Sequence, residues 1–136
     1  MRNTIILSLA VLAGVIWVFY PPKGVPENQV TRKQADSIAL PEFSAAAQTG
    51  QTYYLAKCAE CHGQNGVGSD KGPPLIHRIY EPSHHGDEAF QRAAKLGVQS
   101  HHWGFGDMLP VQGITRAEVQ NIVAYIRELQ RANGIN

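Results

Sequence analysis

The stretch that decides the fold of this chain is Cys58-Ala59-Glu60-Cys61-His62. Its C-x-x-C-H spacing is the attachment signature of c-type haem. On a helix, positions i, i+3 and i+4 share one face, so both cysteines and the histidine would lie on the same side. Two thioether bonds can then hold the porphyrin while the imidazole of His62 reaches the iron. A porphyrin attached in this way stays in place when its iron changes charge, as a redox protein requires.

Three other interpretations of the motif are weaker. A thioredoxin-like dithiol needs a βαβ context, and no strand pattern flanks these cysteines. A zinc site would need His84-His85 or His101-His102 to complete it, but adjacent histidines do not offer the usual spacing of a second ligand pair. A structural disulfide would be strained at this spacing and rare on a helix. Both cysteines of the chain lie in the motif, so none is left for another disulfide.

Length and charge limit the remaining possibilities. A chain of 136 residues allows one domain and little more. Its 12 basic and 11 acidic residues are nearly balanced, so we expect no nucleic acid among its partners.

The N-terminal segment, residues 1–20, differs from the rest because Ile5 to Tyr20 carries no charge. This run is slightly short for a hydrocarbon core of ~30 Å, but a helix that starts at residue 4 can reach across it. No small-x-small cleavage site follows, and Trp17 suits a membrane interface. We therefore expect a single-pass anchor in the cytoplasmic membrane through residues 4–20, with a cleaved signal peptide as the alternative. With Arg2 on the cytoplasmic side, the remaining chain would be periplasmic.

Residues 21–43 are expected to form a linker, because four prolines interrupt any long helix: Pro21, Pro22, Pro26 and Pro41. Such a linker would either act as a tether or lie along the surface of the domain that follows, residues 44–136.

Three helices are predicted in residues 44–136: Ser44 to Lys57, Asp87 to Leu96, and Thr115 to about Asn133. The first carries Gly50 and Tyr54 on the stripe that leads to Cys58, so we expect a close packing contact at Gly50. Phe90, Ala93 and Ala94 share one face of the second helix, which should end at Gly97. The third begins with a Thr115/Glu118 capping box, and we expect its Tyr125 to fit against Gly50. Its apolar stripe consists of Val119, Ile122, Val123, Ile126 and Leu129.

Between the first two helices, residues 63–72 contain four glycines and predict a loop, which leads into Gly72-Pro73-Pro74-Leu75. An iron-ligating histidine normally donates its second N–H to a carbonyl or carboxylate. Pro73 has a free carbonyl and is our candidate partner for His62, and Leu75 is expected to contact the haem ring.

Residues 100–111 hold the other chemically rich segment. Met108 is the only methionine besides Met1, so a thioether ligand to the iron would have to be Met108. His101 and His102 are its rivals, and bis-histidine coordination would lower the reduction potential. A second metal site at the paired histidines is weakly indicated. Trp103 and Phe105 are expected to cover the haem edge, or else to pack in the core.

Over residues 44 to 133 the chain resembles class I cytochrome c. The motifs match in order: a first helix with Gly50 and Tyr54, C-A-E-C-H, Gly-Pro-x-Leu, Met108 near a proline, and a last helix that carries an aromatic residue. The resemblance implies an all-α fold of three to four helices around one haem, with the first and last helices crossing near Gly50 and Tyr125. It also implies thioether bonds at Cys58 and Cys61, His62 and Met108 as iron ligands, and Pro73 as the partner of His62. Met-Leu-Pro replaces the Met-Pro of many members, and His-His-Trp is outside the family pattern.

The expected function is that of a monohaem one-electron carrier that shuttles electrons between redox proteins at the outer face of the membrane. Nothing in the sequence requires a catalytic base or nucleophile, so we expect no enzyme. Residues 44–136 contain equal numbers of basic and acidic residues, which predicts a weak dependence of docking on salt. The alternatives are a haem subunit fixed in a larger oxidoreductase, and a gas or redox sensor whose Met108 leaves the iron.

Overall fold

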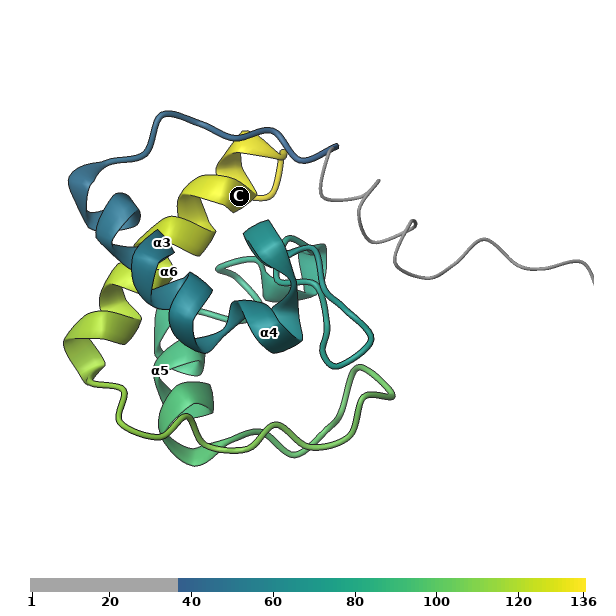
Figure 1. The fold of residues 1–136 in the computed structure, drawn as a ribbon. Coiled ribbons are helices and arrows are strands. Elements are labelled where there is room, and N and C mark those ends of the chain that lie inside the picture. The colour runs from purple at the N-terminus through teal and green to yellow at the C-terminus, as the bar shows by residue number, and fades with distance from the viewer. Residues whose placement is uncertain (1–36) are drawn as a thin grey trace, which may run out of the picture. The chain divides into compact units, whose positions relative to one another are not determined.

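The computed structural model describes residues 37–136, so the predicted membrane anchor and most of the predicted linker lie outside the described residues. The described chain forms helices α3 (Ala45–Lys57), α4 (Ala59–His62), α5 (Asp87–Leu96) and α6 (Arg116–Ala132), and the 3-10 turns η1 (Gln64–Gly66) and η2 (Arg78–Tyr80) (Figure 1). In this part of the chain, strand-like pairing is limited to one isolated bridge between Val98 and Met108. The all-α prediction is therefore confirmed for residues 37–136. None of their helices has the length and apolar character to span a membrane.

The helix ends follow local capping signals that the sequence contains. The Ser44 hydroxyl accepts a hydrogen bond from the backbone N–H of Ala47 at the start of α3. Helix α5 has the predicted bounds and ends at Gly97, which has a φ of +76°. At the start of α6, Thr115 and Glu118 form the predicted capping box.

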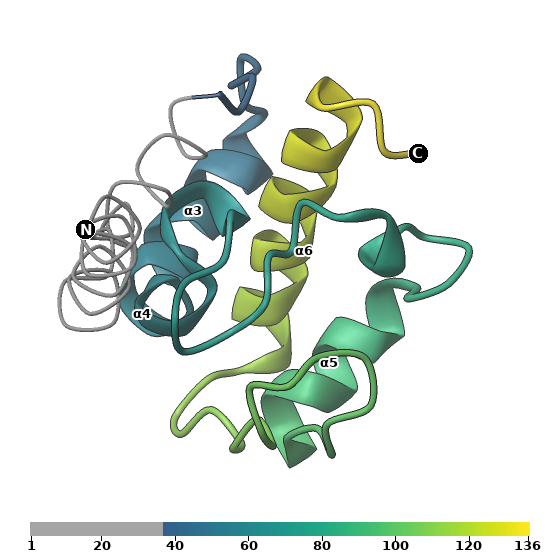
Figure 2. The same ribbon diagram turned by 90° about the vertical axis from the view of Figure 1, so that its right-hand side faces the viewer.

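Helix α6 packs against both α3 and α5 (Figure 2). All five residues of its predicted apolar stripe are buried. The predicted close contact at Gly50 exists, but the nearest neighbour there is the main chain of α6 and not the side chain of Tyr125. A Cβ on Gly50 would lie 1.9 Å from the backbone carbonyl oxygen of Asn121, so the main chain of α6 itself occupies this space. Tyr125 lies one turn further along α6, with its ring 5.4 Å from the ring of Tyr54.

A buried arginine on α6 holds the segment that precedes α5. Only 8% of the Arg127 side chain is exposed. Its guanidinium donates to the Tyr80 carbonyl at 2.6 Å, to the His85 carbonyl at 2.5 Å and to the Asp87 carboxylate at 2.9 Å. Because these acceptors come from η2, the following turn and the first residue of α5, one side chain fixes the path of the backbone from residue 80 to residue 87.

Residues just before α3 also contact the helices. Ile38 and Phe43 pack against the main core. The backbone of Ala39 and the side-chain amide of Asn133 exchange two hydrogen bonds, of 2.9 and 3.0 Å. This stretch of the predicted linker therefore lies along the helical part of the chain, while the boundary at residue 44 stays a prediction.

Candidate haem site

Helix α4 brings the motif residues to one side of the chain. The N–H groups of Cys61 and His62 both bond to the Cys58 carbonyl, at 3.2 and 2.9 Å, as in one helical turn. Cys58 is half-buried and packs against the core, whereas Cys61 is exposed. Both thiols are free. The turn thus presents two unpaired thiols and an imidazole together, as the i, i+3, i+4 spacing predicts.

The environment of Cys58 argues against a redox-active dithiol. Burial, and secondarily the neighbouring Cys61, raise the pKa of the Cys58 thiol to about 11. A catalytic dithiol instead needs a cysteine whose lowered pKa yields a thiolate near neutral pH. The βαβ context of thioredoxin-like proteins is also missing from the described residues, which contain no β-strand.

His62 is held in one orientation. Its Nδ1 lies 2.9 Å from the carbonyl oxygen of Pro73, which can only accept, so Nδ1 carries the proton and donates it. The Nε2 lone pair is left for another partner. Burial lowers the pKa of His62, which keeps the imidazole neutral at pH 7. A neutral, oriented imidazole backed by a carbonyl is the usual arrangement of a metal-ligating histidine.

The loop that follows His62 is supported by two core tyrosines. The Tyr54 hydroxyl donates to the Gly63 carbonyl at 2.8 Å, and the Tyr125 hydroxyl to Oδ1 of Asn65 at 3.0 Å. Our sequence analysis missed Asn65, which has a φ of +57°. Its position before Gly66 was the available signal, because Asn-Gly pairs mark such turns. Leu75 is buried in the main core, and its expected contact with the haem ring stays a prediction.

Met108 lies on a segment whose backbone is tied to α5. The N–H and carbonyl groups of Val98 and Met108 exchange two hydrogen bonds of 2.9 Å each. A further bond of 2.9 Å joins the N–H of Val111 to the Ala94 carbonyl in α5. Gly97 makes this close pairing possible, since a Cβ there would lie 2.4 Å from the Met108 carbonyl oxygen. The half-buried Met108 side chain therefore projects from a fixed stretch of backbone.

The loop between Val98 and Met108 contains the two predicted aromatic contacts. Trp103 is half-buried, with its ring 5.1 Å from that of His77, whereas Phe105 is 43% exposed. The Trp103 Nε1–H is buried, and the Tyr80 side chain lies close enough to interact with it.

These residues fit a covalently bound haem. The thiols of Cys58 and Cys61 can form the two thioethers, and Nε2 of His62 is free to reach an iron.

Comparison with known proteins assigns the family. The family model for cytochrome c matches residues 47–130, which include the C-x-x-C-H motif, Met108 and most of α3 and α6. The searches of curated proteins and of solved structures found no match. The family implies covalently attached haem c and haem-based electron transfer, and both motif cysteines are present. The chain therefore belongs to the cytochrome c family and contains a class I c-type cytochrome domain.

Proposed function

We propose that this protein is a one-electron carrier whose single haem c has His62 and Met108 as axial ligands. The observation that carries the proposal is the orientation of His62, whose Nδ1–H bonds to the Pro73 carbonyl and whose Nε2 is left free beside the two thiols. The haem would supply a reversible Fe(II)/Fe(III) couple. The Pro73 carbonyl would hold the imidazole of His62 in one position in both oxidation states.

The contacts of the loop between Val98 and Met108 favour Met108 over His102, and burial favours it over His101. His102 pairs with His84, with their Nε2 atoms 3.3 Å apart. His101 is exposed, and its bond of 2.8 Å from Nδ1 to the Gln99 carbonyl leaves its Nε2 free. Met108, by contrast, is half-buried, and its side chain makes no hydrogen bond. The bridge to Val98 also restricts its backbone. A His/Met pair raises the reduction potential relative to bis-histidine ligation.

A carrier role fits the rest of the chain. If His62 and Met108 both bind the iron, no position would remain there for a substrate. We propose that its partners are other redox proteins, and that residues 4–20 anchor it in the cytoplasmic membrane with the haem domain in the periplasm. The small, charge-balanced domain suits brief encounters of this kind.

A spectroelectrochemical titration of the full-length protein tests the proposal. We expect a single one-electron transition whose potential falls clearly in Met108→His, because bis-histidine ligation favours ferric iron. Leu109→Ala is the matched control, since the neighbouring Leu109 is 80% exposed and should leave the potential unchanged. If Met108→His shifts the potential no more than Leu109→Ala does, Met108 is not a ligand.

A further inference from the structure

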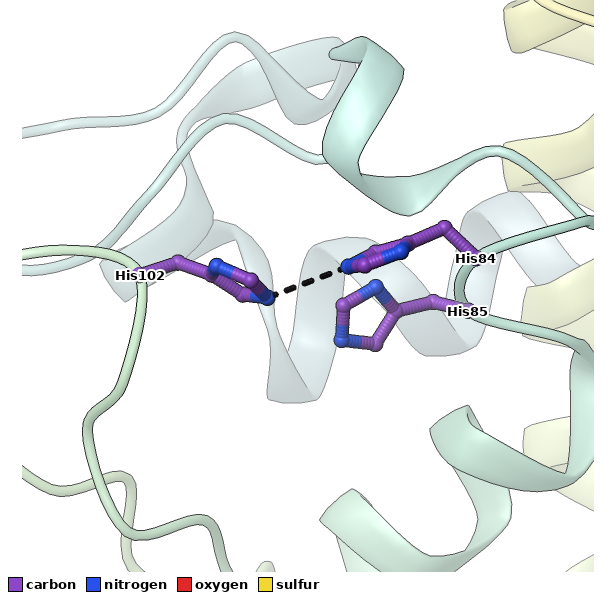
Figure 3. Close-up of side chains that lie close together, drawn as sticks. All are labelled: His84, His85 and His102. Carbon is purple, nitrogen blue, oxygen red and sulfur yellow. Dashed lines mark hydrogen bonds between the residues drawn. The ribbon is translucent and has the colours of Figure 1, made fainter.

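Three histidines from two separate segments meet at the surface of the described chain. His84 and His85 lie in the turn between η2 and α5, and His102 lies in the loop between Val98 and Met108. The imidazoles of these residues, hereafter the His84/85/102 cluster, face one another (Figure 3). Each offers one ring nitrogen, and these three nitrogens all lie within 4.8 Å of one another. None of them is needed by the proposed haem site.

The hydrogen bonds of the cluster leave lone pairs on its ring nitrogens. Nδ1 of His85 lies 2.6 Å from the Ile79 carbonyl, which can only accept. His85 therefore carries its proton on Nδ1 and a lone pair on Nε2, as metal-ligating histidines with a carbonyl partner do. The Nε2 atoms of His84 and His102 point at each other across 3.3 Å, so that one proton is shared between two lone pairs. A cation could take the place of that proton.

The spacing matches the geometry of a metal site. Two nitrogens bound ~2.0–2.1 Å from one ion at the tetrahedral angle lie ~3.3 Å apart. This is the separation of the His84 and His102 nitrogens. The three nitrogens lie within 4.8 Å of one another and must draw together around an ion, since two ligands of one ion are never much more than ~4 Å apart. His84 and His102 are exposed, so their rings are free to make this adjustment.

The backbone on both sides of the cluster is already fixed. The N–H groups of His84 and His85 bond to the Glu81 carbonyl at 3.1 and 2.8 Å, and Arg127 donates to the carbonyl of His85. Across from them, the loop of His102 is closed by the Val98–Met108 bridge and by a bond of 2.8 Å from the N–H of Ser100 to Asp107. A bound ion would therefore enter a largely formed site.

We propose that the His84/85/102 cluster binds one divalent ion of a late first-row transition metal, separate from the iron. Imidazole ligands suit copper, zinc and nickel, while the lack of carboxylates in the set disfavours magnesium and calcium. By the Irving–Williams order copper(II) binds most tightly. The ion ties the turn after η2 to the loop that leads to Met108, which raises the resistance of this loop to thermal unfolding.

Titration of the full-length holoprotein with one metal at a time tests this site. Zinc(II) is added to chelator-treated protein in a calorimeter, and copper(II) is followed by electron paramagnetic resonance, where nitrogen hyperfine structure reports imidazole ligands. We expect one equivalent of either ion to bind. Affinity should fall at least about tenfold in His84→Gln and in His102→Gln, since each removes a ligand.

His77→Asn is the control, because it removes a histidine outside the cluster. The side chain of His77 caps η2, and asparagine is a good N-cap, so this variant should fold and bind metal as the wild type does. In the wild type, zinc should also shift the ring-proton resonances of His84, His85 and His102 and spare those of His77. The proposal is overturned if no one-equivalent binding is seen, if the cluster variants bind as well as the wild type, or if zinc leaves these resonances unmoved.

Discussion

Two glycines, Gly50 and Gly97, stand where the backbone of another segment approaches closely. At Gly50 the neighbour is the Asn121 carbonyl of α6, and at Gly97 it is the Met108 carbonyl. Backbone atoms cannot rotate away as a flexible side chain can. Each glycine therefore fixes the distance between two segments. Gly50 does so at the crossing of α3 and α6, and Gly97 does so beside the proposed iron ligand Met108.

Gly50→Ala should strongly destabilise the domain, because the new methyl group would lie 1.9 Å from the Asn121 carbonyl oxygen and force α3 and α6 apart. Overpacking of this kind costs typically 1–3 kcal/mol, and we expect about 3 kcal/mol or more for a backbone clash. Denaturant unfolding measures the loss. Gly104→Ala is the control, since no atom lies within 4 Å of a Cβ there; equal losses in the two variants would contradict the account.

Gly97→Ala should loosen the Met108 segment. The alanine would have to adopt the left-handed φ of +76° that Gly97 has, which costs about 1–2 kcal/mol. Its Cβ would also lie 2.4 Å from the Met108 carbonyl oxygen. Gly106→Ala, at a φ of +84° in open space, introduces the backbone strain without the contact. Carbon monoxide binding to the reduced protein should therefore increase in Gly97→Ala and stay low in Gly106→Ala. Similar behaviour of both variants would show that the Val98–Met108 pairing does not hold the ligand.

Among the helices, α6 has the most fully capped start. Glu118 accepts from the N–H and the hydroxyl of Thr115, at 2.7 and 2.8 Å, while the hydroxyl accepts from the N–H of Glu118 at 3.3 Å. The backbone bond from Thr115, followed by the hydroxyl bond, lowers the pKa of Glu118 below its ordinary value of 4.5. The negative charge also lies at the positive end of the helix dipole.

This lowered pKa predicts a dependence of stability on pH. Because the folded pKa lies below the unfolded one, the contribution of Glu118 is complete above pH 4.5 and is lost as the pH falls through the folded pKa. Glu118→Gln keeps an acceptor but removes the charge. Urea unfolding of both proteins from pH 7 to pH 3 should show a small stability difference that disappears in acid. A difference that stays constant would mean that the charge contributes nothing.

For the whole molecule, helix positions could be predicted from the sequence because their signals are local. Ser44, Thr115 and Gly97 act on backbone groups within a turn of themselves, and the partner of His62 lies in a short motif eleven residues away. The register of α3 against α6 was not predictable, because it depends on packing between segments some 70 residues apart. That is why Asn121, and not Tyr125, fills the space at Gly50.

Longer-range polar groupings were also beyond the sequence. The burial of Arg127 depends on three carbonyl and carboxylate acceptors that the fold collects from residues 80 to 87. The meeting of His102 with His84 and His85 depends on how two loops fold over one another. In the sequence, the adjacent pairs His84-His85 and His101-His102 indicated metal binding only weakly. They did not indicate which of the four rings would meet.

The charge balance of residues 44–136, eight basic against eight acidic side chains, predicts electron exchange that depends only weakly on salt. The reduced protein should react with an anionic and with a cationic inorganic oxidant at rates that change by less than about twofold as salt is raised. Stopped-flow kinetics measures both rates. A steep fall with one oxidant and a rise with the other would reveal a strongly charged face near the haem.

The central claim, that His62 and Met108 occupy both axial positions of a covalently bound haem, is tested most directly by absorption spectra of the purified full-length protein. The oxidised and reduced forms are recorded with and without carbon monoxide, beside Met108→Ala. We predict the weak long-wavelength band of a methionine-ligated ferric haem and a reduced spectrum that the gas does not change, with both properties lost in the variant. A wild type that lacks the band, or whose reduced spectrum shifts with carbon monoxide, would contradict the claim.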